Sequence, residues 1–193
     1  MKRIFLAGLL GGIAMFAWTS LAHLVLPLGT TGVQEIPNEA PVLAAMQASL
    51  GQNSGFYFFP GLGLGPHPSK EQERAGMQDY QKKLDANPSG ILIYRPAGSV
   101  KALDPRQLGI EFLTEFLEAL LAAFLLAQTR LTGYVGRVGF VLVAGMIAAM
   151  TTNVPYWNWY SFPTNYTEAY AFTQIVGYLC VGLVAAAIVK PKD

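Results

Sequence analysis

The chain has 193 residues, of which 52% are hydrophobic and only 13% charged, and its formal net charge is +1. A soluble domain is usually about a quarter charged, so this deficit is typical of a membrane protein. The few, scattered basic residues argue against a nucleic-acid partner, and a single cysteine, Cys180, excludes an internal disulfide.

The first apolar run covers residues 4–26. The tripeptide at 20–22, Ser-Leu-Ala, resembles a signal-peptide cleavage site, but the run is longer than a usual signal core. We therefore expect an uncleaved transmembrane helix. Gly8 and Gly12 form a GxxxG pair, which is weak evidence for close helix packing.

Residues 28–104 carry most of the charge and predict a small extramembrane α/β domain. Its expected elements are a helix at 38–50, a strand at 55–60, a helix at 69–86 that a Ser69–Gln72 capping box opens, and a strand at 91–94. The order strand, helix, strand favours a parallel pair. Because two strands alone are marginally stable, we expect this domain to lean on the membrane helices or on a partner.

The second span is predicted at 105–128, with Asp104 as its N-cap. Three glutamates, Glu111, Glu115 and Glu118, interrupt its apolar sequence at positions i, i+4 and i+7. This spacing places them on one side of the helix. Carboxylates in a spanning helix are costly, so this side is expected to face protein or water rather than lipid.

The third and fourth spans are predicted at 138–155 and 168–189, with Pro155 ending the third. The segment between them is aromatic, as sequences at the membrane–water boundary often are. Its large side chains are candidates for partner contact: Trp157, Trp159, Tyr160 and Phe162. The expected fold class is an all-α transmembrane four-helix bundle with a small extramembrane α/β insertion, of two short strands, between helices 1 and 2.

Charge distribution predicts the topology. With four spans, six basic residues fall on one side of the membrane: Lys2, Arg3, Arg130, Arg137, Lys190 and Lys192. The positive-inside rule then places both termini in the cytoplasm and residues 28–104 outside. We expect a multi-pass protein of the bacterial inner membrane.

Depth along the second span can be counted from its outer end. Glu111 is then roughly 5 Å, Glu115 roughly 10 Å and Glu118 roughly 15 Å below the outer surface of the hydrocarbon. The other three spans bring further polar residues to the same leaflet: His23, Asn153, Gln174 and Tyr178. The pattern predicts a polar cavity open to the outside, whose residues handle a ligand or protons. Because an isolated charge at mid-membrane is costly, Glu118 is expected to be neutral and hydrogen-bonded to Tyr178 or Thr19.

Three functions fit these observations. The leading prediction is a non-catalytic accessory or partner-binding subunit of a membrane complex, in contact with the lipid bilayer and with a protein partner or a second copy. The alternatives are proton, ion or small-solute handling at the glutamates, and a membrane enzyme or metal site at the outer leaflet. His23, Glu111 and Glu115 could supply metal ligands, but the Glu-x-x-His pairs of di-iron bundles are missing from the sequence and no motif implies a cofactor.

Overall fold

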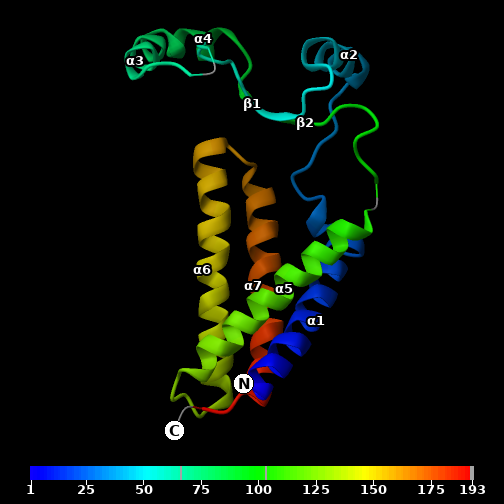
Figure 1. The fold of residues 1–193 in the computed structure, drawn as a ribbon, viewed down its shortest axis with the longest axis vertical. Coiled ribbons are helices and arrows are strands. Elements are labelled where there is room, and N and C mark those ends of the chain that lie inside the picture. Colours follow the sequence, from blue (N-terminus) through cyan, green and yellow to red (C-terminus); the bar gives the residue numbers. More distant parts are fainter. Residues whose placement is uncertain (66, 103, 192–193) are drawn as a thin grey trace. The chain divides into compact units, whose positions relative to one another are not determined.

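The computed structural model describes residues 1–65, 67–102 and 104–191. Within them the chain forms seven α-helices, one short 3₁₀-helix and two strands, so the structure is mostly helical. It divides into two compact units, drawn in Figure 1. Unit 1 is Met1–Gln34 with Leu103–Asp193, and unit 2 is Glu35–Ala102.

Unit 1 contains four long helices. They are α1 (Lys2–Leu24), α5 (Pro105–Ala127), α6 (Tyr134–Tyr160) and α7 (Thr164–Ile188), and the 3₁₀-helix η1 (Pro27–Gly29) follows α1. Three of them, α1, α6 and α7, are long and apolar enough to cross a membrane. The glutamates keep α5 out of this set, although its 23 residues equal the length of α1. Four spans are therefore not confirmed.

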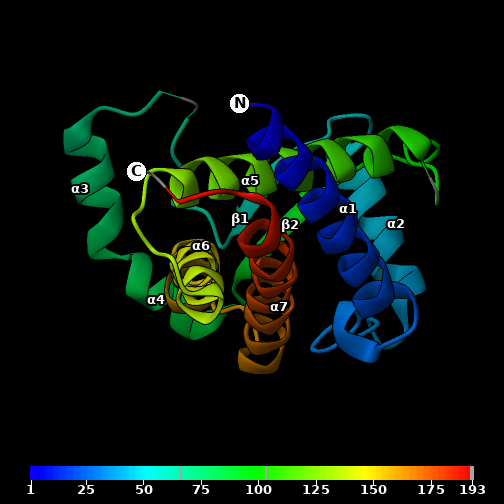
Figure 2. The same ribbon diagram turned by 90° about the horizontal axis from the view of Figure 1, so that it is seen from below.

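The four long helices do not form a closed bundle. Figures 1 and 2 show α1 lying along α5 and α7, and α6 lying along α7, whereas α5 makes only marginal contact with α6 and α7. The core is built from small residues, mainly alanine and valine: Ala7, Ala119, Ala123, Val141, Val181 and Ala185 are among its buried members. Small side chains allow the helices to approach closely.

The contact between α1 and α5 depends on glycine. A Cβ atom on Gly8 would lie 2.8 Å from the Cα of Leu120, and one on Gly12 would lie 2.7 Å from the Cα of Phe116. One turn further along α1, the ring of Phe16 packs edge-on against Phe112. Contact positions four residues apart along α1 meet positions four residues apart in the opposite direction along α5. The two helices therefore run antiparallel in a fixed register.

The predicted end of the third span at Pro155 is wrong. Helix α6 continues through Pro155 to Tyr160, and Ser161, with a φ of 55°, ends it. A proline inside a helix removes one hydrogen bond, but ring packing supports the next turn, since the rings of Tyr156 and Tyr160 lie 5.7 Å apart. The predicted aromatic loop is therefore reduced to residues 161–163, because Trp157, Trp159 and Tyr160 belong to α6 and α7 begins at Thr164.

Unit 2 contains three helices and a two-stranded sheet. The elements are α2 (Glu39–Leu50), β1 (Gly55–Phe59), α3 (Lys70–Gln78), α4 (Tyr80–Ala86) and β2 (Gly90–Tyr94). The strands are antiparallel, with Tyr57 opposite Leu92, so the predicted parallel pair is wrong. The expectation of parallel strands in a strand–helix–strand unit assumes that the connecting helix packs on the sheet. Here α4 instead packs against the loop after β1, where Lys83 Nζ donates to the carbonyl oxygens of Gly61 and Leu62.

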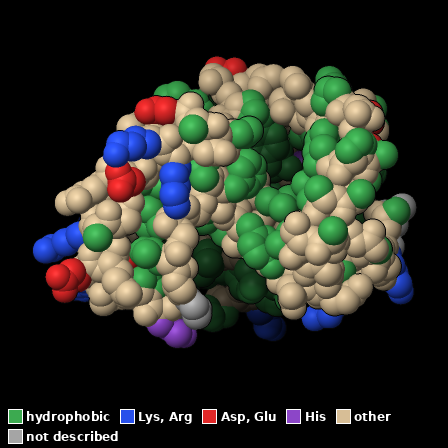
Figure 3. All heavy atoms as spheres, turned by 90° about the horizontal axis from the view of Figure 1, so that it is seen from above, with side chains coloured by type: hydrophobic (Ala, Val, Ile, Leu, Met, Phe, Trp, Pro, Cys, Tyr) green, Lys and Arg blue, Asp and Glu red, His purple; other side chains and the backbone are tan. Residues whose placement is uncertain are grey.

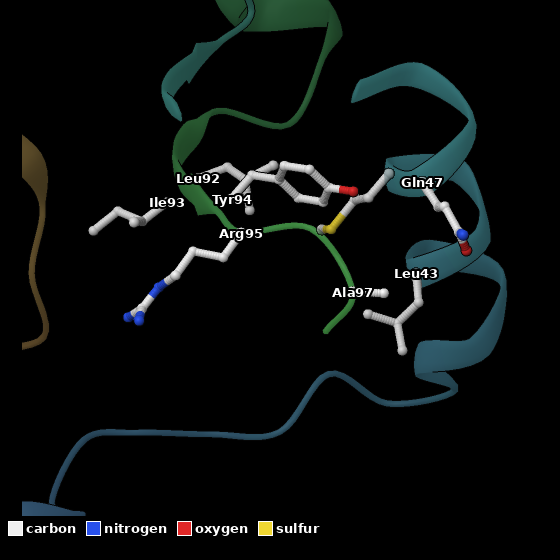
Figure 4. Close-up of a pocket in the computed structure, with 8 residues that line it drawn as sticks. Leu43, Gln47, Leu92, Ile93, Tyr94, Arg95 and Ala97 are labelled. Atoms are coloured by element: carbon white, nitrogen blue, oxygen red, sulfur yellow. The ribbon is translucent and has the colours of Figure 1, made fainter. Parts of the chain in front are cut away.

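The two faces of the sheet differ. One face carries Tyr57, Leu92 and Tyr94, and α2 covers it across an apolar pocket of about 400 Å³. Figure 4 shows the Tyr94 ring directed toward α2, with Ile93 directed away from it. The other face, called here the exposed sheet face, consists of the cross-strand pairs Phe56–Ile93 and Phe58–Ile91.

Unit 2 has no core of its own in the described part of the chain. None of its described residues is buried. Figure 3 shows charged side chains gathered over the part of unit 2 that holds α3 and α4. The sheet, in contrast, exposes 55% of Phe56 and 68% of Ile93.

The close approach of α1 and α5 can be tested with Gly12→Ala. The new methyl group would meet backbone rather than a movable side chain, so we expect a loss of about 1–3 kcal/mol in the free energy of unfolding of unit 1. Gly109→Ala in α5 is the matched control, because a Cβ atom there meets nothing within 4 Å. It should stabilise the helix by about 0.5–1 kcal/mol. Thermal unfolding of the purified protein in detergent measures both, and equal effects would contradict the glycine contact.

Candidate functional site

The three glutamates of α5 occupy three different environments. Glu111 is exposed, Glu115 is buried with 4% of its surface exposed, and Glu118 is half-buried. Because they lie at i, i+4 and i+7, the helix presents them in succession along one side. Glu115 is therefore the most buried of the three, although the depth count placed Glu118 deepest in the membrane.

Glu115 is held by a hydroxyl from α1. The Thr19 hydroxyl bonds to Glu115 Oε1, and the same hydroxyl lies 2.9 Å from the carbonyl oxygen of Met15. A carbonyl and a carboxylate both only accept, and a hydroxyl has a single hydrogen to donate. Both contacts are satisfied when Glu115 is a neutral acid that donates to Thr19, which in turn donates to Met15.

The second carboxyl oxygen of Glu115 has no hydrogen-bond partner among the described residues. Buried polar atoms are seldom left unbonded, and those that are usually have a structural or chemical reason. Glu115 is thus the one fully buried acid in the described part of unit 1, and only half of its bonding capacity is used.

Glu118 lies beside α7. Its carboxyl group is within interaction range of the Tyr178 hydroxyl. The Tyr178 ring rests directly on Gly145 of α6, where a Cβ atom would lie only 2.3 Å from the Cβ of Tyr178. Of the two partners expected for Glu118, Tyr178 is therefore the one in contact, and Thr19 binds Glu115 instead.

A cavity of about 420 Å³ lies beside Glu111, between α1, α5 and α7. Its polar lining includes His23 and Thr19 of α1, Glu111 of α5 and Tyr170 of α7. The His23 ring is fixed by its Nδ1 atom, which lies 2.9 Å from the carbonyl oxygen of Thr19. A carbonyl only accepts, so Nδ1 carries a hydrogen, and in the neutral ring Nε2 then presents a lone pair.

Asn153 and Gln174 form a separate polar contact between α6 and α7. Asn153 Nδ2 donates to Gln174 Oε1 at 2.6 Å and to the carbonyl oxygen of Ala149 at 2.8 Å. Neither residue lines the cavity beside Glu111. The structure therefore places the seven predicted ligand or proton-handling residues in three groups: His23 with Glu111 and, behind Thr19, Glu115; Glu118 with Tyr178; and Asn153 with Gln174.

The chain shows no significant match to models of known protein families, to curated proteins or to solved structures. The arrangement of these side chains is therefore the basis for any functional argument.

The predicted partner-contact residues lie where α6 meets α7. Trp157, Trp159 and Tyr160 are exposed, with Trp159 reaching 78%, whereas Phe162 is half-buried. The Trp157 indole donates to Thr164 Oγ1 at 3.1 Å. The composition of this cluster is typical of a membrane boundary, and Trp157, Tyr160 and Phe162 make contacts within unit 1.

Tyr170 is a cavity residue that the sequence analysis missed. Its ring stacks on Tyr166 at 4.4 Å and lies edge-on to His23 at 5.9 Å. A signal was present in the sequence, because Tyr166 and Tyr170 lie four residues apart and so share one side of α7, and Phe162 lies a further four residues before them.

The polar series of α5 ends at Glu118 in the described residues. Beyond Glu118, the buried residues of α5 are all apolar: Ala119, Ala122, Ala123 and Leu126. No polar group of α5 continues the series in the described residues. Among the described residues, no group of three His, Cys, Asp or Glu side chains is placed to hold a metal ion, so a metal site at His23, Glu111 and Glu115 has no geometric support.

The Thr19–Glu115 contact can be tested with Thr19→Val, which keeps the shape of the side chain but removes the hydroxyl. Glu115 then has no described partner, so we expect a loss of about 1–3 kcal/mol in the free energy of unfolding. The double variant Thr19→Val, Glu115→Leu should recover most of this loss. Thr151→Val is the control, because the Thr151 hydroxyl is exposed and bonds only within α6. Additive effects of Thr19→Val and Glu115→Leu in a double-mutant cycle would show that the pair is not coupled.

Proposed function

We propose that the protein is a multi-pass membrane protein that acts as an accessory subunit, and that unit 2 binds a protein partner. The observation that carries this proposal is the lack of any buried residue among the described residues of unit 2. A two-stranded sheet is marginally stable without further packing, so a surface that covers this one would stabilise it.

The lipid-facing side of α5 supports a fourth span. Its exposed apolar residues recur every three or four positions: Ile110, Leu113, Leu117, Leu121 and Phe124. Two of the glutamates point elsewhere, since Thr19 of α1 binds Glu115 and Tyr178 of α7 lies beside Glu118. Acidic side chains satisfied by neighbouring helices, with an uncharged stripe toward lipid, are the pattern that membranes tolerate.

The topology proposed for unit 1 follows from its charges. Figure 1 shows the start of α1 and the end of α7 at the same end of unit 1. The basic residues Lys2, Arg3 and Lys190 belong to this end. By the positive-inside rule, the end that carries them is cytoplasmic, and unit 2, inserted between α1 and α5, is outside.

Labelling of single cysteines in intact cells tests this topology. In a variant with Cys180→Ser, Glu73→Cys in α3 should react with a membrane-impermeant maleimide, and Lys190→Cys should react only after the cells are opened. Labelling of position 190 but not of position 73 in intact cells would reverse the proposed orientation.

The chemistry of the exposed sheet face favours protein over lipid as the partner. Its cross-strand pairs are entirely apolar, so water is a poor environment for them. Surfaces that lie on anionic lipid usually add several Lys or Arg around the apolar residues. The paired positions of this face carry none, and Arg95, which follows β2 directly, is the one basic residue in the segments that flank the two strands. The outer edge of each strand can also pair with an added strand.

Site-specific photo-crosslinking tests the partner. A photoreactive residue at Phe56 should give a discrete protein adduct in membranes, and one at Gln78 in α3 should not. The double variant Phe56→Ser, Ile93→Ser should lose the partner on purification in mild detergent. Met77→Ser, which changes an apolar residue of α3 that is 58% exposed, should retain it. Adducts to lipid alone, or to a second copy of this chain alone, would contradict the accessory role.

A further inference from the structure

We propose that the cavity beside Glu111 binds the primary ammonium group of a small organic amine. This inference concerns unit 1, goes beyond the partner role of unit 2 and does not depend on it. The cavity has about 420 Å³ of space, and most of its walls are hydrocarbon or aromatic, with a few polar groups. Sites for small organic molecules have this composition.

The charge of the cavity selects a cation. Glu111 is the only acidic side chain among the described residues that line it, and neither Lys nor Arg is one of them. The Glu111 carboxylate is exposed and takes part in no ion pair among the described residues. Glu115 lies directly behind the wall, bonded to the lining residue Thr19, and adds no positive charge. An anionic ligand would therefore meet repulsion, and a cation would meet an unpaired carboxylate.

His23 adds an acceptor of fixed direction. Its Nδ1–H is committed to the Thr19 carbonyl oxygen, and Gly29 packs so closely on the ring that a Cβ atom there would lie 2.7 Å from Cδ2. The remaining lone pair on Nε2 can accept one N–H. A primary ammonium has three N–H donors, so it can bind a carboxylate and an imidazole nitrogen together.

The aromatic lining suits the same ligand. Tyr170 and Phe16 supply rings from α7 and α1, and the Tyr170 ring is held by its stack on Tyr166. Aromatic faces attract ammonium groups, and rings together with Leu24 and Leu108 receive a hydrocarbon tail. A divalent metal is a poorer fit, because no group of three ligating side chains is placed to hold one in the described part of the chain.

Calorimetric titration of the full chain in phosphatidylcholine nanodiscs tests the site, with hexylammonium as the probe. We expect saturable binding of hexylammonium and none of hexanol, its uncharged counterpart. Glu111→Gln should weaken binding by about tenfold or more, since a hydrogen bond to a charged group contributes at least this factor. Glu168→Gln is the matched control, because Glu168 is an exposed acid of α7 outside the cavity, and it should leave affinity within about twofold.

A second pair of variants tests the aromatic wall of the cavity instead of its charge. Tyr170→Phe retains the ring and should bind hexylammonium nearly as well as the original chain, whereas Tyr170→Leu should bind it several-fold more weakly. Failure of hexylammonium to bind, equal binding of hexanol, or an unchanged affinity in Glu111→Gln would overturn the proposal. None of these results bears on the crosslinks of unit 2, so the two proposals fail separately.

The amine can come from a lipid headgroup or from a free solute. Adding phosphatidylethanolamine to the nanodiscs distinguishes them. A fall in the apparent affinity for hexylammonium, seen in the original chain, supports a headgroup amine as the natural ligand. An unchanged affinity supports a free amine.

Discussion

The structure of unit 1 depends on one constraint, which is that a carboxyl group lies buried between two apolar helices. Glu115 has 4% of its surface exposed, and a bare carboxylate in such a place would cost several kcal/mol. The Thr19 hydroxyl gives the neutral acid a hydrogen-bond partner, but only if α1 lies close to α5 in one register. Gly8 and Gly12 allow that approach, because their missing side chains leave room for the backbone of α5. The contact between Thr19 and Glu115 therefore depends on the close helix approach that the two glycines allow.

Local signals in the sequence predicted local structure well. The Ser69–Gln72 capping box and the Asp104 cap are confirmed, because such bonds join residues two or three apart. Asn38 precedes α2 as expected but makes no side-chain cap bond. Strand direction and the end of α6 were wrong for a different reason. They depend on where α4 packs and on rings stacking across the Pro155 turn, which are contacts that no short window contains.

The candidate site, too, was predicted where local spacing decides it and missed where contacts between helices decide it. Helical spacing alone placed Glu111, Glu115 and Glu118 on one side of α5, and the structure agrees. Depth counted along a helix could not say which glutamate is buried, since burial is decided by the neighbouring helix. Thr19 covers Glu115, whereas the half-buried Glu118 lies beside Tyr178, near the marginal contact of α5 with α7. Tyr170 was missed because its role in the cavity requires α7 to lie beside α1.

The two units differ in how they bury apolar side chains, and the two proposals rest on this difference. Unit 1 buries mainly alanine, valine and glycine, with Met15 and Leu126, and leaves most of its large apolar residues facing outward, where lipid can cover them. Unit 2 buries none of its described residues and places Phe56 and Ile93 on an uncharged face. Lipid can stabilise the first arrangement without any other protein, whereas the proposed partner of unit 2 would cover the second. A ligand of unit 1 would then act at Glu111 whether or not unit 2 is occupied, unless binding at one unit changes the stability of the other. Measuring amine affinity with and without the partner would determine that coupling, because any effect of one on the other must be reciprocal.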